Sequence, residues 1–339
     1  MSGHEIIVIG ASAGGVEALP RLIGSLPADL PASVFIVLHI PALGPDLLQK
    51  IIGRNAALTV KNGIDGEKIE RGHVYVAPPD QHLQMEGGCV RVTRGPRENR
   101  HRPSIDALFR SAAEAYGPRV TGVVLTGYLD DGTAGLHSVQ THGGTAIVQD
   151  PKDAAAPGMP ESALRNVKVD HCLPLAEIGP LLVRLATSQS LPKRKKGATP
   201  MGKMEKRQMS PAEMENKFGP PTGFICPECN GPLWEMKSPL QFRCHVGHTY
   251  SPDSLLADHA DGLERALWSA VRTFDEQAAL LRRLGTRRFE SQSYGSDLEA
   301  RAAIFEADAE VIRGLLQNDP SRLIGIDGGV AGLTANRQR

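Results

Sequence analysis

The first 186 residues alternate short apolar runs with amphipathic stretches, and this alternation constrains the fold more than any other feature. The apolar runs that we expect to be strands are Glu5–Gly10, Ser33–Leu38, Arg119–Leu125 and Gly144–Gln149. The stretches with helical spacing are Val16–Leu26, Ser104–Tyr116 and Thr133–Thr141. Continuous apolar strands that alternate with helices are typical of a parallel sheet covered on both faces. We therefore predict a doubly wound, mostly parallel α/β sheet with helices on both faces.

Residues 73–93 interrupt this alternation with two short runs of their own. The runs flank Gly87 and Gly88, and such a pair of residues is typical of a tight β-hairpin turn. We expect this hairpin to lie at the edge of the sheet.

Length and charge narrow the class of protein further. The chain has 339 residues, which suggests two domains, and its 38 basic residues balance 38 acidic ones. This balance excludes a polycation that wraps nucleic acid and an acidic disordered tail. No apolar run reaches the roughly 18 residues of a membrane span, and the first residues lack the basic patch of a signal peptide. We expect a cytoplasmic protein.

Composition changes after residue 186, and we expect residues 187–221 to form a flexible basic linker. Residues 188–217 contain eight basic and three acidic residues, a difference of +5, with few large apolar side chains. A solvated spacer explains this segment. Contact with nucleic acid or an anionic membrane surface is the alternative. The segment has no aromatic residue on which a base could stack, and this weighs against nucleic acid as a partner.

A cysteine cluster follows the linker, and we predict that residues 222–252 form a zinc-ribbon-like module. Cys226, Cys229, Cys244 and His248 have the spacing C-x₂-C-x₁₄-C-x₃-H. Two such ligand pairs suit tetrahedral zinc, and four protein ligands close its coordination shell. We therefore expect a structural Zn²⁺ rather than a catalytic one. His245 is an alternative fourth ligand, but its spacing from Cys244 is less suitable.

The remaining residues have the pattern of long helices. Apolar side chains recur at three- or four-residue spacing from Asp253 to Leu284, and a second pattern runs from Asp297 to Leu316. Between them, Tyr294-Gly295-Ser296 reads as a break. We expect a helical hairpin over residues 253–320 and a tail over residues 321–339. The apolar stripes suit a core or a seam between copies of the chain, and a partner-binding groove is the further alternative.

One serine stands at a turn with catalytic potential. Gly10-Ala11-Ser12-Ala13-Gly14 ends the first predicted strand and opens a helix. Ser12 occupies the place of the second glycine of a dinucleotide fingerprint, and the Lys of a P-loop is missing, so neither phosphate-binding motif fits. What remains is G-x-S-x-G, in which the serine hydroxyl projects above the sheet and helix amides can stabilise an oxyanion. A serine that only caps the helix is the alternative.

Three further side chains follow other predicted strands. His39 comes directly after the run that ends at Leu38, and Asp130 and Asp131 follow the strand that ends at Leu125. Ligands of parallel sheets bind at the carboxyl ends of the strands, so these residues and Ser12 converge on one edge. A serine nucleophile needs a base and an orienting carboxylate, and these residues can supply both. A satisfied strand-end histidine and a helix-capping aspartate are the structural alternatives.

These segments give the chain a family resemblance. Residues 1–186 resemble the catalytic domain of the chemotaxis protein-glutamate methylesterases of the CheB type. The matching segments are IGASAGG at Ser12, LHIP at His39, HRPSIDALF at 101–109, LTGYLDDGTAG at Asp131 and QDPKDAAAPGMP at 149–160. The resemblance implies Ser12 as nucleophile, His39 as general base and then acid, and Asp131 as the orienting carboxylate. It also places the oxyanion and substrate loop at Ala13 and Tyr128.

The resemblance implies a reaction as well. Members of the family hydrolyse glutamate methyl esters on chemoreceptors and deamidate particular glutamines, with no cofactor in catalysis. The chain departs from the family in two respects: no receiver domain precedes the Ser12 strand, and Tyr128-Leu129-Asp130 replaces the usual Met-Gly-Asn. A catalytically weak signalling adaptor, which binds proteins through the esterase cleft and the zinc and helical module, is therefore the alternative function. The zinc-ribbon-like module and the helices resemble a C-terminal extension of some standalone homologues.

Overall fold

The computed structural model describes residues 5–42, 47–187, 209–237, 240–288 and 292–318. It divides into two compact units, one up to Ser254 and the other from Leu255 onward. Most of the expected linker, residues 188–208, and the expected tail lie outside the described residues. No helix in the described part of the chain is long and apolar enough to cross a membrane.

A seven-stranded sheet organises the first unit, with the strand order β3-β4-β2-β1-β7-β8-β9. Every neighbouring pair of strands in it is parallel. The strands are β1 (Glu5–Ala11), β2 (Ala32–Leu38), β3 (Thr59–Asn62), β4 (His73–Val76), β7 (Val120–Val124), β8 (Thr145–Gln149) and β9 (His171–Leu173). The predicted α/β class is confirmed, and β1, β2, β7 and β8 are the four strands expected from their apolar runs.

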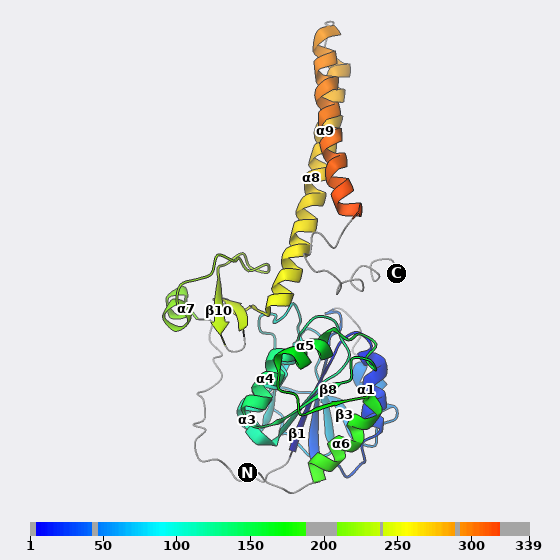
Figure 1. The fold of residues 1–339 in the computed structure, drawn as a ribbon, viewed down its shortest axis with the longest axis vertical. Coiled ribbons are helices and arrows are strands. Elements are labelled where there is room, and N and C mark those ends of the chain that lie inside the picture. Colours follow the sequence, from blue (N-terminus) through cyan, green and yellow to red (C-terminus); the bar gives the residue numbers. More distant parts are fainter. Residues whose placement is uncertain (1–4, 43–46, 188–208, 238–239, 289–291, 319–339) are drawn as a thin grey trace. The chain divides into compact units, whose positions relative to one another are not determined.

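Helices cover both faces of this sheet (Figure 1). They are α1 (Gly15–Gly24), α2 (Leu48–Gly53), α3 (Ile105–Tyr116), α4 (Thr133–Thr141), α5 (Gly158–Asn166) and α6 (Leu175–Thr187). Alternate residues of β1 point to opposite faces: Ile7 and Ile9 join the core under α1, α2 and α6, whereas Ile6 and Val8 join the core under α3, α4 and α5. This two-sided burial explains why the central strands are apolar at every position.

The predicted hairpin forms, but it stands apart from the main sheet. Strands β5 (His82–Glu86) and β6 (Cys89–Thr93) pair antiparallel as a sheet of their own. Gly87 and Gly88 form the turn, both with positive φ (61° and 85°). The first residues of the expected hairpin, 73–76, are instead strand β4 of the main sheet, because they pair in parallel with β2 and β3.

A small sheet follows in the same unit. Helix α7 (Pro211–Phe218) precedes it, within the range that we expected to be linker, and a Ser210–Glu213 capping box begins that helix. The sheet consists of the antiparallel strands β10 (Leu233–Lys237), β11 (Leu240–Cys244) and β12 (Thr249–Tyr250).

The second unit is a pair of long helices. Helix α8 (Pro252–Arg288) and helix α9 (Gln292–Asn318) lie side by side (Figure 1). Val271, Ala309 and Leu316 form a small apolar core between them, and Arg313 bonds Asp275 at 2.6 Å. The helical hairpin is therefore as predicted, except that α9 begins before Tyr294-Gly295-Ser296, so the expected break there is wrong.

Candidate active site and candidate metal centre

Ser12 lies at the carboxyl end of β1, in the tight turn before α1. Gly14 has φ 80°, and a Cβ there would lie 2.7 Å from the Cβ of Ala155, so the turn favours glycine both conformationally and sterically. The Ser12 backbone N–H donates to Thr126 O on the neighbouring strand end, at 2.9 Å. The turn therefore holds Ser12 rigidly above the sheet.

His39 lies beside Ser12 because β1 and β2 pair in parallel. Ala11 and Leu38 are register partners, and the next residue on each strand is Ser12 and His39. The His39 N–H donates to Ala11 O at 3.2 Å, which extends the ladder to this point. The His39 Nδ1 is buried and has no hydrogen-bond partner, and the described residues show no bond between it and Ser12 Oγ.

Asp131 binds the other nitrogen of the same ring. The His39 Nε2 lies 2.8 Å from Asp131 Oδ2. A carboxylate at this distance accepts the Nε2–H, and this leaves Nδ1 as the unprotonated, basic nitrogen of the neutral ring. The structure thus brings His39 and Asp131 together as the sequence predicted, and it places Ser12 on the adjacent strand end.

The N-terminus of α3 holds the Asp131 carboxylate. The Ile105 N–H donates to Oδ2 at 2.7 Å, and the Ser104 hydroxyl donates to Oδ1 at 3.0 Å. Burial alone would raise the pKa of Asp131, but the hydrogen bond and charge of His39 and the surrounding donors hold it well below its usual range. The donors around Asp131 therefore favour its anionic form.

The loop after β7 lies against Ser12. A Cβ at Gly127 would lie 2.8 Å from the Ser12 Cβ and even closer to Met159 Sδ, so only glycine fits there. Tyr128 follows and is 42% exposed, and Leu129 has a positive φ of 60°. Within the described residues the Ala13 N–H has no acceptor. Ala13 follows Ser12 in the turn, and Tyr128 follows Gly127 in the loop that contacts Ser12, so their role in an oxyanion loop stays a prediction.

His101 was given no role in the sequence analysis, yet its ring lies against that of His39. Its ring stacks on His39 with 3.5 Å between centroids and 10° between planes. Burial and the neighbouring His39 lower the pKa of His101 to about 3, so the ring is neutral. Its place at the start of the HRPSIDALF segment, just before the amides that bind Asp131, is the signal that could have identified it.

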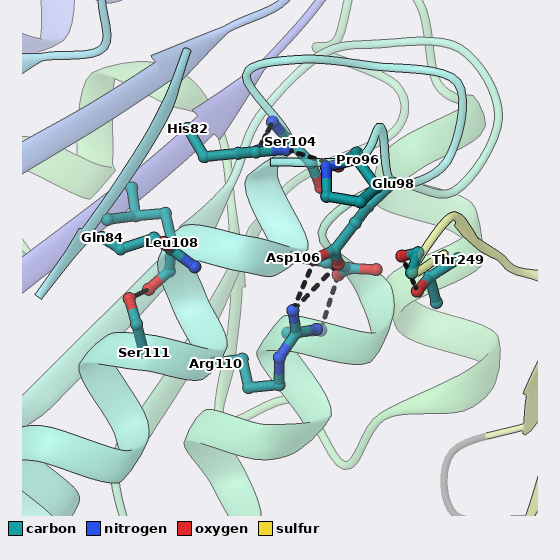
Figure 2. A network of polar contacts seen from close by, with 12 residues as sticks. His82, Gln84, Pro96, Glu98, Ser104, Asp106, Leu108, Arg110, Ser111 and Thr249 are labelled. Atoms are coloured by element: carbon teal, nitrogen blue, oxygen red, sulfur yellow. Dashed lines mark hydrogen bonds and ion pairs between the residues drawn. The ribbon is translucent and has the colours of Figure 1, made fainter. Parts of the chain in front are cut away.

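The loop that carries His101 is fixed by a buried polar network (Figure 2). Arg110 of α3 donates to both carboxylate oxygens of Glu98 at 2.9 Å. Burial would raise the pKa of Glu98, but the Arg110 charge outweighs it and lowers that pKa. His82 accepts from the Ser104 N–H at Nδ1 and donates to Pro96 O from Nε2. The loop of residues 96–104 is therefore held at Pro96 and Ser104 by His82 and at Glu98 by Arg110.

Asn99 lies at the centre of this loop and was also missed by the sequence analysis. It is 2% exposed and has a positive φ of 49°, a conformation that asparagine tolerates better than most residues. Its Nδ2 donates to Asp131 Oδ1 at 2.9 Å and to Asp106 Oδ2 at 2.7 Å. Burial and the charge of Asp131 raise the pKa of Asp106 well above its usual value. No local motif marks Asn99, because its partners are distant in the sequence.

Asp130 differs from its neighbour Asp131 although both are buried. Its Oδ1 accepts from the Ser251 hydroxyl at 2.8 Å. Burial raises the pKa of Asp130 to about 7, only partly opposed by the Ser251 hydrogen bond. The structure therefore distinguishes the two aspartates that the sequence placed at this strand end.

Four potential metal ligands meet beside the small sheet: Cys244 ends β11, and the other three lie outside the strands. The ligand atoms of Cys226, Cys229, Cys244 and His248 all lie within 4.8 Å of one another. Cys244 Sγ is 3.5 Å from His248 Nδ1 and 3.7 Å from Cys229 Sγ. Bonds of about 2.3 Å to sulfur and about 2.0 Å to nitrogen at a tetrahedral angle give ligand separations of this size. His245 is not part of the group.

Fold and site together define a class of protein. It is a parallel α/β protein with a serine on a strand-to-helix turn and a buried histidine–aspartate pair at the same sheet edge. A match to the family described as CheB methylesterase spans residues 7–182. The chain belongs to the CheB methylesterase family.

Individual relatives agree with this assignment. The chain is 38% identical over 192 residues to protein-glutamate methylesterase/protein-glutamine glutaminase 2 of Methanosarcina mazei, covering 54% of this chain and 52% of the relative. It is 40% identical over 186 residues to enzyme 5 of the same name from Anaeromyxobacter dehalogenans, covering 54% and 51%. The chain thus spans about half the length of these two relatives.

A solved structure has the same fold. The Thermotoga maritima CheB methylesterase catalytic domain matches with a TM-score of 0.51 and 35% identity, covering 54% of this chain and 99% of the domain. The resemblance inferred from the sequence motifs is confirmed for this half of the chain.

Proposed function

We propose that the protein is a serine hydrolase that removes methyl esters from glutamate side chains of chemoreceptors or related signalling proteins. The names of the relatives combine this activity with glutamine deamidation, and the same acyl transfer serves both reactions. The catalytic residues are Ser12, His39 and Asp131, and catalysis uses no cofactor. The enzyme acts in the cytoplasm.

The chemistry begins with proton transfer from Ser12 Oγ to His39 Nδ1. The oxygen attacks the ester carbonyl, and the Ala13 N–H and the Tyr128 loop face the oxyanion that forms. His39 then returns the proton to the leaving methoxide, so methanol departs and the glutamyl group stays on Ser12 as an ester. Water, deprotonated by His39, cleaves this ester and restores Ser12. Asp131 stabilises the imidazolium in both halves.

The observation that carries the proposal is that the two nitrogens of the His39 ring have different surroundings. Nε2 is bound to Asp131, whereas Nδ1 is buried, unpartnered and on the strand end next to Ser12. A histidine with only a structural role would have both nitrogens satisfied. In a hydrolase the free nitrogen is the one that takes the serine proton.

Methanol release from a methylated receptor tests the proposal. We expect Ser12→Ala to reduce turnover by about 10⁴-fold or more, as in other serine triads. The matched control is Ser25→Ala, because Ser25 lies after α1 and its hydroxyl bonds only Leu22 O. Equal turnover in wild type and Ser12→Ala would refute the proposal that the protein is a serine hydrolase.

The second candidate is a signalling adaptor with weak or no catalysis. It is favoured by two observations: Ser12 Oγ makes no bond to His39 in the described residues, and Tyr128-Leu129-Asp130 departs from the usual family pattern. An adaptor would bind the receptor with equal affinity in wild type and Ser12→Ala while neither released methanol.

For the rest of the chain we propose a structural zinc and an interaction role. Zn²⁺ held by Cys226, Cys229, Cys244 and His248 would close its coordination shell and stabilise the module of residues 222–252. The exposed apolar side chains of the helical hairpin, among them Ile304, Val311 and Leu315, suit association with another copy. Residues 1–186 form the catalytic domain in this division. The methylated protein is the proposed partner, and nucleic acid is not.

A further inference from the structure

The side chain of Asn99 forms hydrogen bonds with two different parts of the first unit. Its Nδ2 donates to Asp131 and Asp106, as described above. Its Oδ1 accepts from the Ser251 N–H at 2.9 Å and from the Ser254 hydroxyl at 3.2 Å. An amide has two donors and two acceptor positions, so both donors and at least one acceptor position are occupied. The single hydrogen of the Ser254 hydroxyl is shared between Asn99 Oδ1 and the nearer Ser251 Oγ, at 2.6 Å.

The residues on the acceptor side follow the candidate metal ligands directly. Ser251 is three residues after His248, and between them β12 pairs with β11, which ends at Cys244. The Cys244 N–H donates to His248 O at 3.1 Å. The Asn99 N–H donates to Thr249 O at 2.8 Å, within β12 itself. Two of the candidate metal ligands, Cys244 and His248, therefore lie on the same short, continuous piece of chain as Thr249, Ser251 and Ser254, which contact Asn99.

The same piece of chain also contacts the other side of the triad aspartate. The Ser251 hydroxyl donates to Asp130, the residue before Asp131, and bonds the Ser254 hydroxyl at 2.6 Å. All of these groups are buried, so each hydrogen bond lost would leave an unsatisfied polar atom in a low-dielectric site.

The orientation of the amide matters chemically. If Asn99 turned over, its oxygen would face the Asp131 and Asp106 carboxyl groups and its NH₂ would face the Ser251 N–H. The donors of residues 251 and 254 hold the oxygen end, and therefore keep the donor end toward Asp131. A carboxylate that is correctly held keeps the His39 ring in its productive tautomer and orientation.

We propose that metal binding at the Cys/His cluster sets the catalytic competence of the triad through Asn99, which acts as a positioning residue. The bound metal orders residues 249–254, these orient the Asn99 amide, and the amide aligns Asp131. The inference rests on the proposed esterase function. It gives the small sheet a role in catalysis that its fold alone does not suggest.

The test compares the full-length protein with and without metal, as wild type and as Asn99→Gly. Glycine retains the positive φ of residue 99 and removes only the side chain. The control is Arg97→Gln, because the Arg97 side chain also contacts the Cys/His segment, through Glu228 at 3.1 Å in the turn between Cys226 and Cys229, but bonds no triad side chain among the described residues. Two readouts are taken: kcat and KM for methanol release, and the NMR signal of the His39 Nε2 proton.

We expect chelation to lower the kcat of wild type and of Arg97→Gln by about tenfold, the effect of one charge-assisted hydrogen bond, with KM little changed. Adding zinc back should restore the kcat of both proteins. Metal-loaded Asn99→Gly should show the same loss, and chelation should add nothing further, because the two changes break one connection. The His39 Nε2 signal should weaken or shift in each of these cases.

Two results would overturn the inference. One is a metal-loaded Asn99→Gly with the kcat and His39 signal of wild type, a measurement that does not require the metal to be removed. The other is chelation that lowers kcat by the same factor in wild type and Asn99→Gly. Failure of the proposed function is distinguishable: no form would then release methanol, while the His39 signal would still respond to metal and to Asn99→Gly.

Discussion

Two regions of the first unit are built in different ways. One is the carboxyl edge of the parallel sheet, and the other is the small sheet of β10, β11 and β12 with the four candidate metal ligands beside it, called the Cys/His sheet below. At the edge, backbone register between β1 and β2 places Ser12 beside His39, and two aliphatic cores make that register rigid. The Cys/His sheet has three short strands and buries few large side chains, among them Leu233, Trp234 and Tyr250. The first region takes its geometry from the fold, whereas the second depends on its ligands.

After Ser12→Ala, the largest effect expected at the sheet edge comes from Asp131→Asn. An amide at this position donates to His39 Nε2, forces the proton onto Nδ1 and removes the base that faces Ser12. We expect kcat for methanol release to fall by about 10⁴-fold with the fold retained. Asp170→Asn is the matched control, since Asp170 also accepts a backbone N–H, that of Ala146, at 2.8 Å. A loss of kcat of less than about tenfold would show that Asp131 does not take part in catalysis.

The ligand-dependent region should respond to loss of one thiol. Cys244→Ser removes a buried ligand, and we expect stoichiometric zinc to be lost and residues 222–252 to become susceptible to protease, while the parallel sheet stays folded. Elemental analysis and limited proteolysis measure this. Cys172→Ser is the control because Cys172 is exposed and outside the cluster. If Cys244→Ser keeps its zinc and its resistance to protease, the Cys/His sheet does not depend on its ligands, and the contrast with the sheet edge is wrong.

A smaller effect is expected at Gly127, where the fold leaves no space. An added methyl group would displace Ser12 or Met159, and a displacement of about 1 Å costs about 100-fold in rate. We expect Gly127→Ala to lower kcat by that order. Gly87→Ala, at a turn with open space around it, should leave kcat unchanged. Equal activity of both variants would mean that the loop after β7 does not position the nucleophile.

The smallest effect concerns stability and pH. Burial raises the pKa of Asp130 from 3.8 to about 7. Between about pH 4 and pH 7, Asp130 therefore keeps a proton in the folded protein that it has released in the unfolded chain. This contribution to stability is fully present below about pH 4 and is lost as pH rises through 7. Asp130→Asn cannot ionise, so the Tm of wild type minus that of the variant should decrease from pH 4 to pH 8. A constant difference would contradict the raised pKa.

The sequence predicted those parts of the site that depend on strand ends. Ser12, His39 and Asp131 each follow an apolar run, and the carboxyl ends of parallel strands share one edge. Asn99 and His101 were missed because their positions depend on a loop held by tertiary contacts, such as the Arg110 side chain and the Thr249 backbone, that no local sequence pattern shows. Helix α7 begins with a capping box that the basic composition obscured. Gly295 does not end a helix, because a glycine within a helix is tolerated at a modest cost.

The central claim is that Ser12 carries the glutamyl group during the reaction. Intact-protein and peptide mass spectrometry, after rapid mixing with a peptide that contains a glutamate methyl ester, measures this directly. The account predicts a transient adduct on the Ser12 peptide, heavier by the mass of the substrate peptide minus methanol, and its absence in Ser12→Ala. Methanol release from wild type without any adduct on Ser12, or with one on another residue, would contradict the account.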